Sequence, residues 1–191
     1  MPGPRMQRIL PERKVVLALG SNLGDRLATL QAAVDALAAT PGFVVHAVSK
    51  LVETPAWKVD GVDTEAPTYF NAVVLGGTTL EPLQLLSRTA AIEDALGRVR
   101  AERWGDRTLD IDIITVGGVT HDDETLVLPH PRAWQRAFVL EPWLDVEPFA
   151  QLPGAGAVAQ LRTRATDAVT DRPERLTLPR DHRPPTESST P

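Results

Sequence analysis

The sequence contains no cysteine. This absence excludes disulfide bonds, zinc–thiolate sites and cysteine nucleophiles. No apolar run approaches the ~20 residues that a membrane-spanning helix needs. The N-terminal stretch MPGPRMQRILPER carries prolines and charges but lacks the apolar segment of a secretory signal. We therefore expect a cytoplasmic protein.

The chain also has fewer positively than negatively charged residues. The chain has 20 Lys and Arg against 25 Asp and Glu, which gives a formal net charge of −5. This balance argues against broad binding of nucleic acid or of an anionic membrane, although a local basic pocket is compatible with it. The 191 residues are enough for one domain with a proper core.

The composition changes at both ends of the chain. We expect a flexible N-terminal arm over residues 1–13, one domain over residues 14–165 and a tail over residues 166–191. The tail is rich in proline and charge and ends in PRDHRPPTESSTP. That composition is typical of a disordered segment.

Hydrophobic periodicity predicts the elements between these ends. In chain order we expect a strand at 14–20, a helix at 24–40, a β-rich segment at 43–54, a loop at 55–68, a strand at 69–77, a helix at 82–97 and a strand before the glycine pair at 117–118. Smaller elements follow at 126–129 and 138–146. This order predicts an α+β fold, the ferredoxin-like βαββαβ sandwich, in which helices pack on an antiparallel sheet.

Two carboxylates interrupt the last strand, in the segment RWGDRTLDIDIITVGG. Because a strand points alternate side chains to opposite faces, Asp110 and Asp112 share one face, with Cα atoms roughly 6.5–7 Å apart. Such a pair can hold Mg²⁺, which takes oxygen ligands and completes its shell with water and substrate phosphates. The alternative is a strand with one solvent-exposed face, where aspartate is tolerated although depleted.

Arginines lead into these aspartates. They are Arg98, Arg100, Arg103 and Arg107. The planar fork of arginine suits phosphate oxygens, so the segment is typical of a polyphosphate site. The alternative is a set of surface ion pairs with nearby carboxylates, which would carry no function. One such carboxylate, Asp106, stands directly beside Arg107.

Three weaker candidates accompany this segment. GSNLGDR, at residues 20–26, joins a strand to a helix but matches neither the dinucleotide-binding nor the Walker pattern. Tyr69 and Phe70 open a strand and fit a core as well as a ligand platform. His130 stands between two prolines in LPHPR, where a fixed loop could present it to phosphate.

Taken together, five segments resemble the 6-hydroxymethyl-7,8-dihydropterin pyrophosphokinase family. They are ALGSNLGDR, YFNAVV, GRVRAERWGDRTLDIDII, LVLPHPR and RAFVLEPW, which follow one another between residues 15 and 150. The resemblance implies an ATP-dependent enzyme of folate biosynthesis with a ferredoxin-like fold. It would transfer the diphosphate of ATP to the hydroxymethyl group of the pterin and release AMP.

The resemblance also implies a role for individual residues. Asp110 and Asp112 resemble the pair that holds two Mg²⁺ ions, and Arg98 and Arg107 resemble the arginines that stabilise the transferring group. The implied pterin pocket has Tyr69 and Phe138 stacked on the ring, Asn71 at its edge, and Thr54 and Pro55 in its wall. The implied ATP contacts are Glu93, Arg100, Arg103, Trp104, His130 and Arg136.

The expected partners are therefore two small molecules, ATP and the pterin, with no nucleic acid and no membrane. We expect a monomer, since no apolar surface stripe is evident. Two other functions fit the residues less completely. One is a different Mg²⁺-dependent nucleotidyl or phosphoryl transferase on the same fold, and the other is a non-catalytic module that binds pterin or nucleotide.

Overall fold

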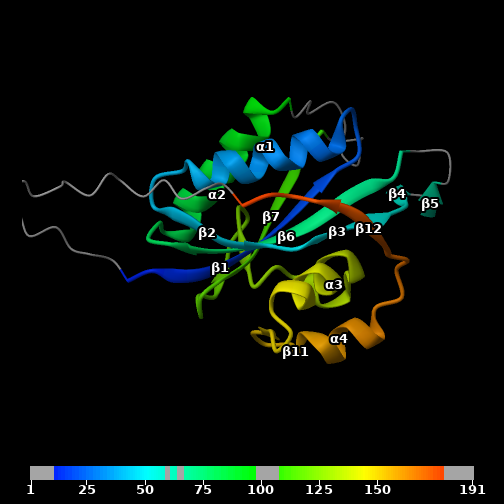
Figure 1. Ribbon diagram of the computed structural model, residues 1–191. Helices are drawn as coiled ribbons and strands as arrows, with labels where there is room; N and C mark the ends of the chain where they lie inside the picture. The colour runs from blue at the N-terminus through cyan, green and yellow to red at the C-terminus, as the bar shows by residue number, and fades with distance from the viewer. Residues whose placement is uncertain (1–10, 59–60, 64–66, 98–107, 179–191) are drawn as a thin grey trace, which may run out of the picture.

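Six antiparallel strands form one sheet through the middle of the molecule (Figure 1). They are β1 (Arg13–Ser21), β2 (Phe43–Val48), β3 (Lys50–Thr54), β6 (Tyr69–Thr78), β7 (Asp110–Val116) and β12 (Thr170–Arg175). The order across the sheet is β12, β3, β6, β1, β7, and β2 pairs with β6. The computed structural model describes residues 11–58, 61–63, 67–97 and 108–178.

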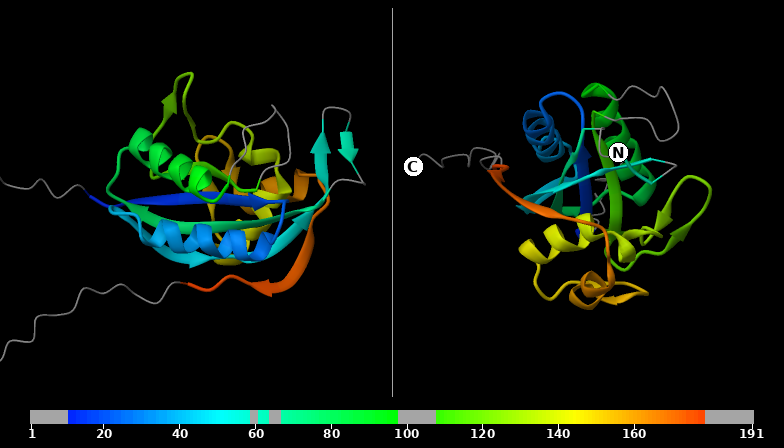
Figure 2. Two further views of the ribbon diagram at one scale, coloured as in Figure 1. Left: turned by 90° about the horizontal axis from the view of Figure 1, so that it is seen from above. Right: turned by 90° about the vertical axis from the view of Figure 1, so that its right-hand side faces the viewer.

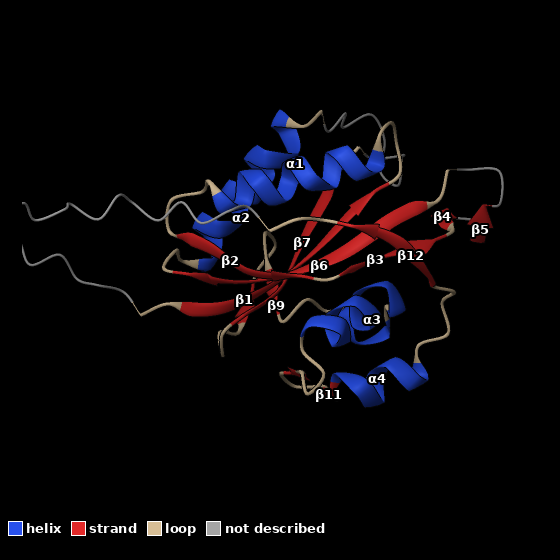
Figure 3. Ribbon diagram, viewed as in Figure 1, coloured by secondary structure: helices blue, strands red, loops and turns tan. Residues whose placement is uncertain are grey.

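Helices cover both faces of this sheet, as Figure 3 shows by colour. They are α1 (Arg26–Ala38), α2 (Pro82–Ala95), α3 (Ala137–Val146), α4 (Val158–Arg164) and a short 3₁₀ turn at Ala133–Gln135. The two views of Figure 2 place α1 and α2 on one face and α3 and α4 on the other. Each face has its own apolar cluster: Leu17 and Leu19 of β1 belong to the first, and Val16 and Val73 to the second. Strand alternation supplies both.

The first two helices start and stop where their sequences indicate. The Asp25 side chain accepts a hydrogen bond from the backbone N–H of Ala28 at 3.0 Å and caps α1. Pro82 is the first residue of α2, a position at which its missing N–H is not needed. Gly97 follows that helix with a φ of 90°, a conformation that glycine adopts without strain. Both predicted helices are thus confirmed.

The predicted β-rich segment at 43–54 forms two strands, β2 and β3, which meet at Ser49. Both pair with β6. The Ser49 backbone N–H donates to the Val73 carbonyl at 2.9 Å, and its hydroxyl oxygen accepts from the Val73 N–H at 2.8 Å. The side chain therefore replaces a strand hydrogen bond at the break.

Two expectations for connecting segments are wrong. The segment at 55–68 is not all loop, because β4 (Ala56–Lys58) and β5 (Gly61–Asp63) pair as a small ribbon. The prediction of a disordered tail from residue 166 is wrong for Thr170–Arg175, because these residues form β12 and pair with β3. The sequence TDRPER of β12 has no apolar side chain apart from proline, so hydrophobic patterning could not find it. The domain limits themselves stay a prediction.

The remaining elements are short and lie outside the main sheet. β8 (His121–Asp122) pairs with β9 (Val127–Leu128), and β10 (Gln151–Leu152) pairs with β11 (Gly156–Ala157). The strand order and the two helices on one face are those of the predicted ferredoxin-like sandwich, which α3 and α4 extend to a third layer. None of the helices in the described ranges has the length and apolar character needed to cross a bilayer.

Candidate active site

Asp110 and Asp112 lie on the face of β7 that looks toward α3. The neighbouring Leu109, Ile111 and Ile113 are buried in the opposite apolar cluster, beneath α1 and α2. Both aspartates are half-buried. The predicted alternation along this strand is confirmed, and it explains how two carboxylates occupy an apolar run.

Two basic side chains from the next segments approach Asp112. Arg136 Nη1 donates a hydrogen bond to Asp112 Oδ2 at 2.9 Å, and His130 Nε2 lies 3.8 Å from the same oxygen. Arg136 directly precedes α3. The structure thus brings together three of the side chains that the resemblance grouped around the phosphates.

Backbone contacts hold His130 in place. Its own N–H donates to the Ile114 carbonyl at 2.9 Å, and its Nδ1 accepts from the Arg132 N–H at 3.1 Å. Since Nδ1 is an acceptor, the neutral imidazole carries its proton on Nε2, toward Asp112. Burial, joined by the charge of Arg136, lowers the pKa of His130 despite the opposing effect of Asp112. His130 is therefore a neutral hydrogen-bond donor at pH 7.

A second group of expected residues lies two strands away, on β3 and β6. Asn71 is buried, and its Nδ2 donates to Thr54 Oγ1 at 3.0 Å. Tyr69 and Pro55 are half-buried nearby in sequence. Helix α3, which carries Phe138, packs against β6 and β3. Asn71, Thr54 and Phe138 thus come from three elements that contact one another.

Gly20 connects the two groups. Its segment, GSNLGDR, was only a weak candidate for a phosphate loop in the sequence, with no role assigned to Gly20 itself. In the sheet register Gly20 pairs with Asp110 on one side and with Asn71 on the other. Directly paired residues of antiparallel strands point to the same face. A Cβ on Gly20 would lie 3.1 Å from Asn71 Oδ1 and 3.8 Å from Tyr69 Cδ1. The absence of a Cβ at Gly20 therefore lets the Asn71 and Tyr69 side chains lie close to β1, beside the carboxylate strand.

The position of Gly20 in the site follows from the register of three strands, which the sequence of one strand does not give. The next residue of β1 on the same face, Ala18, pairs with Asp112 and with Val73 in the same way. Two small residues at alternate positions of a central strand let neighbouring side chains or a ligand approach the sheet backbone closely. Single-strand periodicity does not reveal which residues of other strands stand beside these two.

Glu93 has a contact that the resemblance did not suggest. It is buried on α2, and its Oε1 accepts a hydrogen bond from the Ile111 N–H at 2.7 Å. Ile111 lies between the two aspartates, and β7 is an edge strand. Glu93 therefore holds the backbone from which Asp110 and Asp112 project. Its contact with ATP stays a prediction.

The other expected residues, Arg98, Arg100, Arg103, Trp104 and Arg107, lie outside the described residues. The two residues that flank them are described. Thr108 Oγ1 donates to the Gly97 carbonyl at 3.1 Å, and the Thr108 carbonyl accepts from Ser21 Oγ at 2.6 Å. Gly97 and Thr108, the described residues on either side of this segment, thus lie next to each other, and Thr108 is two residues before Asp110.

The described carboxylates fit a metal ion that is shared with a substrate. No cluster of three or more His, Asp or Glu side chains that could hold a metal occurs in the part of the chain that the structure describes. Mg²⁺ does not require one, because one or two carboxylates suffice when phosphates and water supply the other ligands. The donor set of Asp110 and Asp112 therefore suits Mg²⁺ bound together with a polyphosphate.

Comparison with known proteins identifies one family. Residues 16–148 match the model of the 7,8-dihydro-6-hydroxymethylpterin-pyrophosphokinase family. Curated relatives are each named 2-amino-4-hydroxy-6-hydroxymethyldihydropteridine pyrophosphokinase. The protein of Methylorubrum extorquens is 47% identical over 74% of this chain and 87% of its own. The corresponding values are 44%, 75% and 77% for Mycobacterium tuberculosis, and 38%, 82% and 84% for Bacillus subtilis.

Solved structures show the same fold. The wild-type HPPK-DHPS protein of Plasmodium falciparum with STZ-DHP aligns with a TM-score of 0.60 at 14% identity, over 83% of this chain and 44% of that one. The same protein with pterin and p-hydroxybenzoate also gives 0.60, at 16% identity over 81% and 42%. The chain thus spans less than half the length of these solved proteins.

Proposed function

The chain belongs to the 7,8-dihydro-6-hydroxymethylpterin-pyrophosphokinase family, and from this premise we propose how its residues bind the substrates and transfer the diphosphate. It is an ATP-dependent pyrophosphokinase of folate biosynthesis. The reaction transfers the diphosphate of ATP to the hydroxymethyl group of 6-hydroxymethyl-7,8-dihydropterin and gives AMP.

One observation carries the assignment of residues. Asp110, Gly20 and Asn71 form a row across three neighbouring strands, on the sheet face that α3 covers. The row joins a carboxylate group to an amide, with only a glycine between them, and Tyr69 lies on the same face of β6 as Asn71. A polyphosphate at one end and a flat heterocycle at the other would meet over Gly20.

We propose that Asp110 and Asp112 hold a pair of Mg²⁺ ions together with the phosphates of ATP. When bound, the ions neutralise phosphate charge and align the two substrates. Arg136 and His130 lie beside Asp112 and donate hydrogen bonds to phosphate oxygens once ATP is present. Arg100, Arg103 and Trp104 are proposed as further ATP contacts, and Arg98 and Arg107 as the residues that stabilise the transferring group.

The pterin binds on the other side of Gly20. Tyr69 and Phe138 stack on its two faces, and Asn71 hydrogen-bonds its edge. The Asn71 amide is held by Thr54, so its remaining oxygen and N–H are oriented before the ligand arrives. Pro55 completes the wall. A preorganised amide costs less to order on binding than a mobile one.

The transfer needs no covalent intermediate with the protein. The pterin hydroxyl oxygen bonds to the β-phosphorus while the bond from that phosphorus to the bridging oxygen of the α-phosphate breaks, and the bridging oxygen leaves with AMP. We propose that Asp110 accepts the hydroxyl proton. The protein's contribution is mainly position and charge, as is usual in phosphoryl-type transfer.

A product assay tests the reaction and the metal ligands together. Purified protein with ATP, Mg²⁺ and the pterin should form AMP only when the pterin is present, whereas a kinase or ATPase would form ADP. We expect Asp112→Ala to lower kcat by about 100-fold or more, because it removes charge stabilisation in the transition state. Thr125→Ala, at an exposed position, serves as the control and should change little. Near-normal turnover by Asp112→Ala would contradict the metal assignment.

Two further expectations from the sequence stay predictions. These are the monomeric state and the cytoplasmic location. Sedimentation of the purified chain would test the first.

A further inference from the structure

The C-terminal part of the domain contacts the backbone next to the proposed pterin residues. We define the C-terminal strap as residues 165–178, which include β12. The strap lies beyond residues 16–148, which match the family. It runs along β3 at the edge of the sheet (Figure 1).

Its first contact is with the β3–β6 side of the pterin site. Arg172 Nη1 donates to Glu53 Oε2 at 3.0 Å, and Arg26 Nη1 donates to Glu53 Oε1 at 3.2 Å. The guanidinium carbons of Arg26 and Arg172 lie 3.8 Å and 5.2 Å from the centroid of the Phe70 ring. Two arginines thus contact one buried ring and share one carboxylate.

These contacts lie on the reverse face of the strands that carry the pterin residues. Glu53 immediately precedes Thr54, and Phe70 lies between Tyr69 and Asn71. Since alternate residues point to opposite faces, fixing Glu53 and Phe70 from behind fixes the direction of Thr54, Tyr69 and Asn71 in front. Arg26 also donates to the Thr68 carbonyl at 2.7 Å, directly before Tyr69.

The second contact is with the α3 side of the site. Asp167 Oδ1 accepts a hydrogen bond from the Ala137 N–H at 2.9 Å. Ala137 is the first residue of α3 and lies between Arg136 and Phe138. The Asp167 carboxylate therefore caps α3 at the point from which one proposed ATP residue and one proposed pterin residue project.

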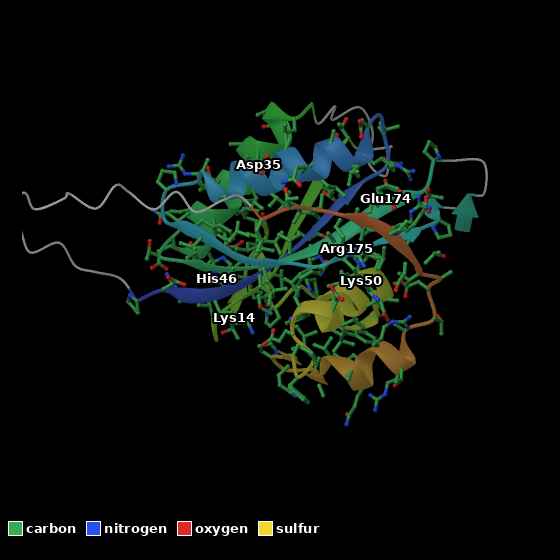
Figure 4. All side chains as sticks on the ribbon, viewed as in Figure 1. Lys14, Asp35, His46, Lys50, Glu174 and Arg175 are labelled. Atoms are coloured by element: carbon green, nitrogen blue, oxygen red, sulfur yellow. The ribbon has the colours of Figure 1, made fainter. Side chains whose placement is uncertain are left out.

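A third set of contacts links the two sides. Lys50 Nζ donates to Glu141 of α3 at 3.1 Å and to Asp171 of β12 at 2.9 Å. Figure 4 shows Lys50 between the sheet and α3, with Glu174 and Arg175 on the neighbouring strand. Asp145 of α3 also accepts from the Lys50 N–H at 2.7 Å. The strap, β3 and α3 are thus held to one another.

We propose that the C-terminal strap positions both walls of the pterin site, with Arg172 and Asp167 as its positioning residues. Arg172 acts through Glu53 and Phe70 on the wall that carries Tyr69 and Asn71. Asp167 acts through Ala137 on the wall that carries Phe138. This proposal rests on the proposed pterin site and adds residues that the family match does not include.

Steady-state kinetics of Arg172→Ala test the first contact. We expect the KM for the pterin to rise about tenfold, with kcat and the KM for ATP unchanged, because a small displacement of an aromatic wall weakens stacking. Arg175→Ala is the matched control. Arg175 lies on the same strand, but its side chain donates to the backbone carbonyls of Arg172 and Glu174 rather than to Glu53. The KM of Arg175→Ala for the pterin should therefore stay at the wild-type value.

A pair of variants at Asp167 tests the second contact. Asp167→Asn keeps an oxygen that can accept from Ala137, and we expect wild-type kinetics. Asp167→Ala leaves that N–H without its acceptor, and we expect both KM values to rise, since Arg136 and Phe138 flank Ala137. A merely structural role would lower the melting temperature of Asp167→Ala and leave both KM values at those of the wild type.

The outcomes separate this proposal from the proposed function. If the wild-type protein forms no pterin-dependent AMP, the function fails. If the wild type is active but Arg172→Ala and Asp167→Ala keep wild-type KM values for the pterin, the strap proposal is overturned. Should Arg172→Ala not fold, Arg172→Lys retains the charge beside Glu53, and its KM for the pterin must exceed that of the wild type.

Discussion

Side-chain size at single positions of β1 decides whether the two halves of the site can meet. Gly20 stands between Asp110 and Asn71 in the register, and a Cβ there would press on Asn71 Oδ1. Asn71 cannot move freely, because it is buried and its Nδ2 is bonded to Thr54. The smallest side chain at position 20 is thus a requirement of the proposed pterin site.

Replacing Gly20 by alanine should therefore weaken pterin binding. We expect the KM for the pterin to rise about tenfold, since Asn71 must shift from its oriented position. Gly118→Ala is the control, because a Cβ at that exposed position would meet nothing within 4 Å. Titration of the pterin in the presence of a non-reactive ATP analogue measures the effect. Equal affinities for the two variants would remove Gly20 from the site.

At the scale of elements, half-buried ion pairs attach the strap to the sheet and helices. Burial alone would raise the pKa of Glu53, but hydrogen bonds from Thr68 and Arg26 and the charges of Arg172 and Arg26 outweigh it and lower the pKa. The charged form is therefore favoured by folding. Its contribution to stability is present above the unfolded pKa and is lost as pH falls through the lower folded pKa.

The Glu53→Gln variant should reveal this dependence on pH. Near pH 7 we expect it to melt below the wild type, because Arg26 and Arg172 lose their shared carboxylate. The difference should shrink as the pH falls below the ordinary glutamate pKa and through the lower folded pKa, because Glu53 then becomes protonated in the wild type as well. Melting temperatures across this range measure it, with Gln at the exposed Glu124 as the control. A difference that does not vary with pH would contradict the assignment.

For the whole molecule, binding of both substrates should stabilise the fold only when Mg²⁺ is present. The proposed site draws on β1, β3, β6, β7 and α3, so ligands bound there favour the native state over the unfolded one. With a non-hydrolysable ATP analogue and the pterin each at about 100 times its dissociation constant, we expect the melting temperature to rise by about 10–20 °C, since each ligand adds about 2.7 kcal/mol.

Chelation of the metal provides the contrast for that measurement. With EDTA in excess, the shift caused by the ATP analogue should disappear, because phosphate charge then faces Asp110 and Asp112 without compensation. An undiminished shift in EDTA would show that the nucleotide binds without the carboxylates.

The sequence by itself determined the order of the elements and the two-sided character of β7. Apolar spacing predicted α1, α2 and the main strands, and strand alternation put Asp110 and Asp112 on one face. These features depend on residues that are close together in the chain, so local periodicity is enough to find them.

Only the tertiary structure decided what stands beside these residues. The register that aligns Gly20 with Asp110 and Asn71 joins three strands, and the ion pair between Arg136 and Asp112 joins residues 24 positions apart. The polar strand β12 was missed because its stability comes from pairing with β3 and from partners such as Glu53, 119 positions from Arg172. Contacts of this kind leave no periodic signal in the sequence, since they are set by how the chain packs rather than by its local pattern.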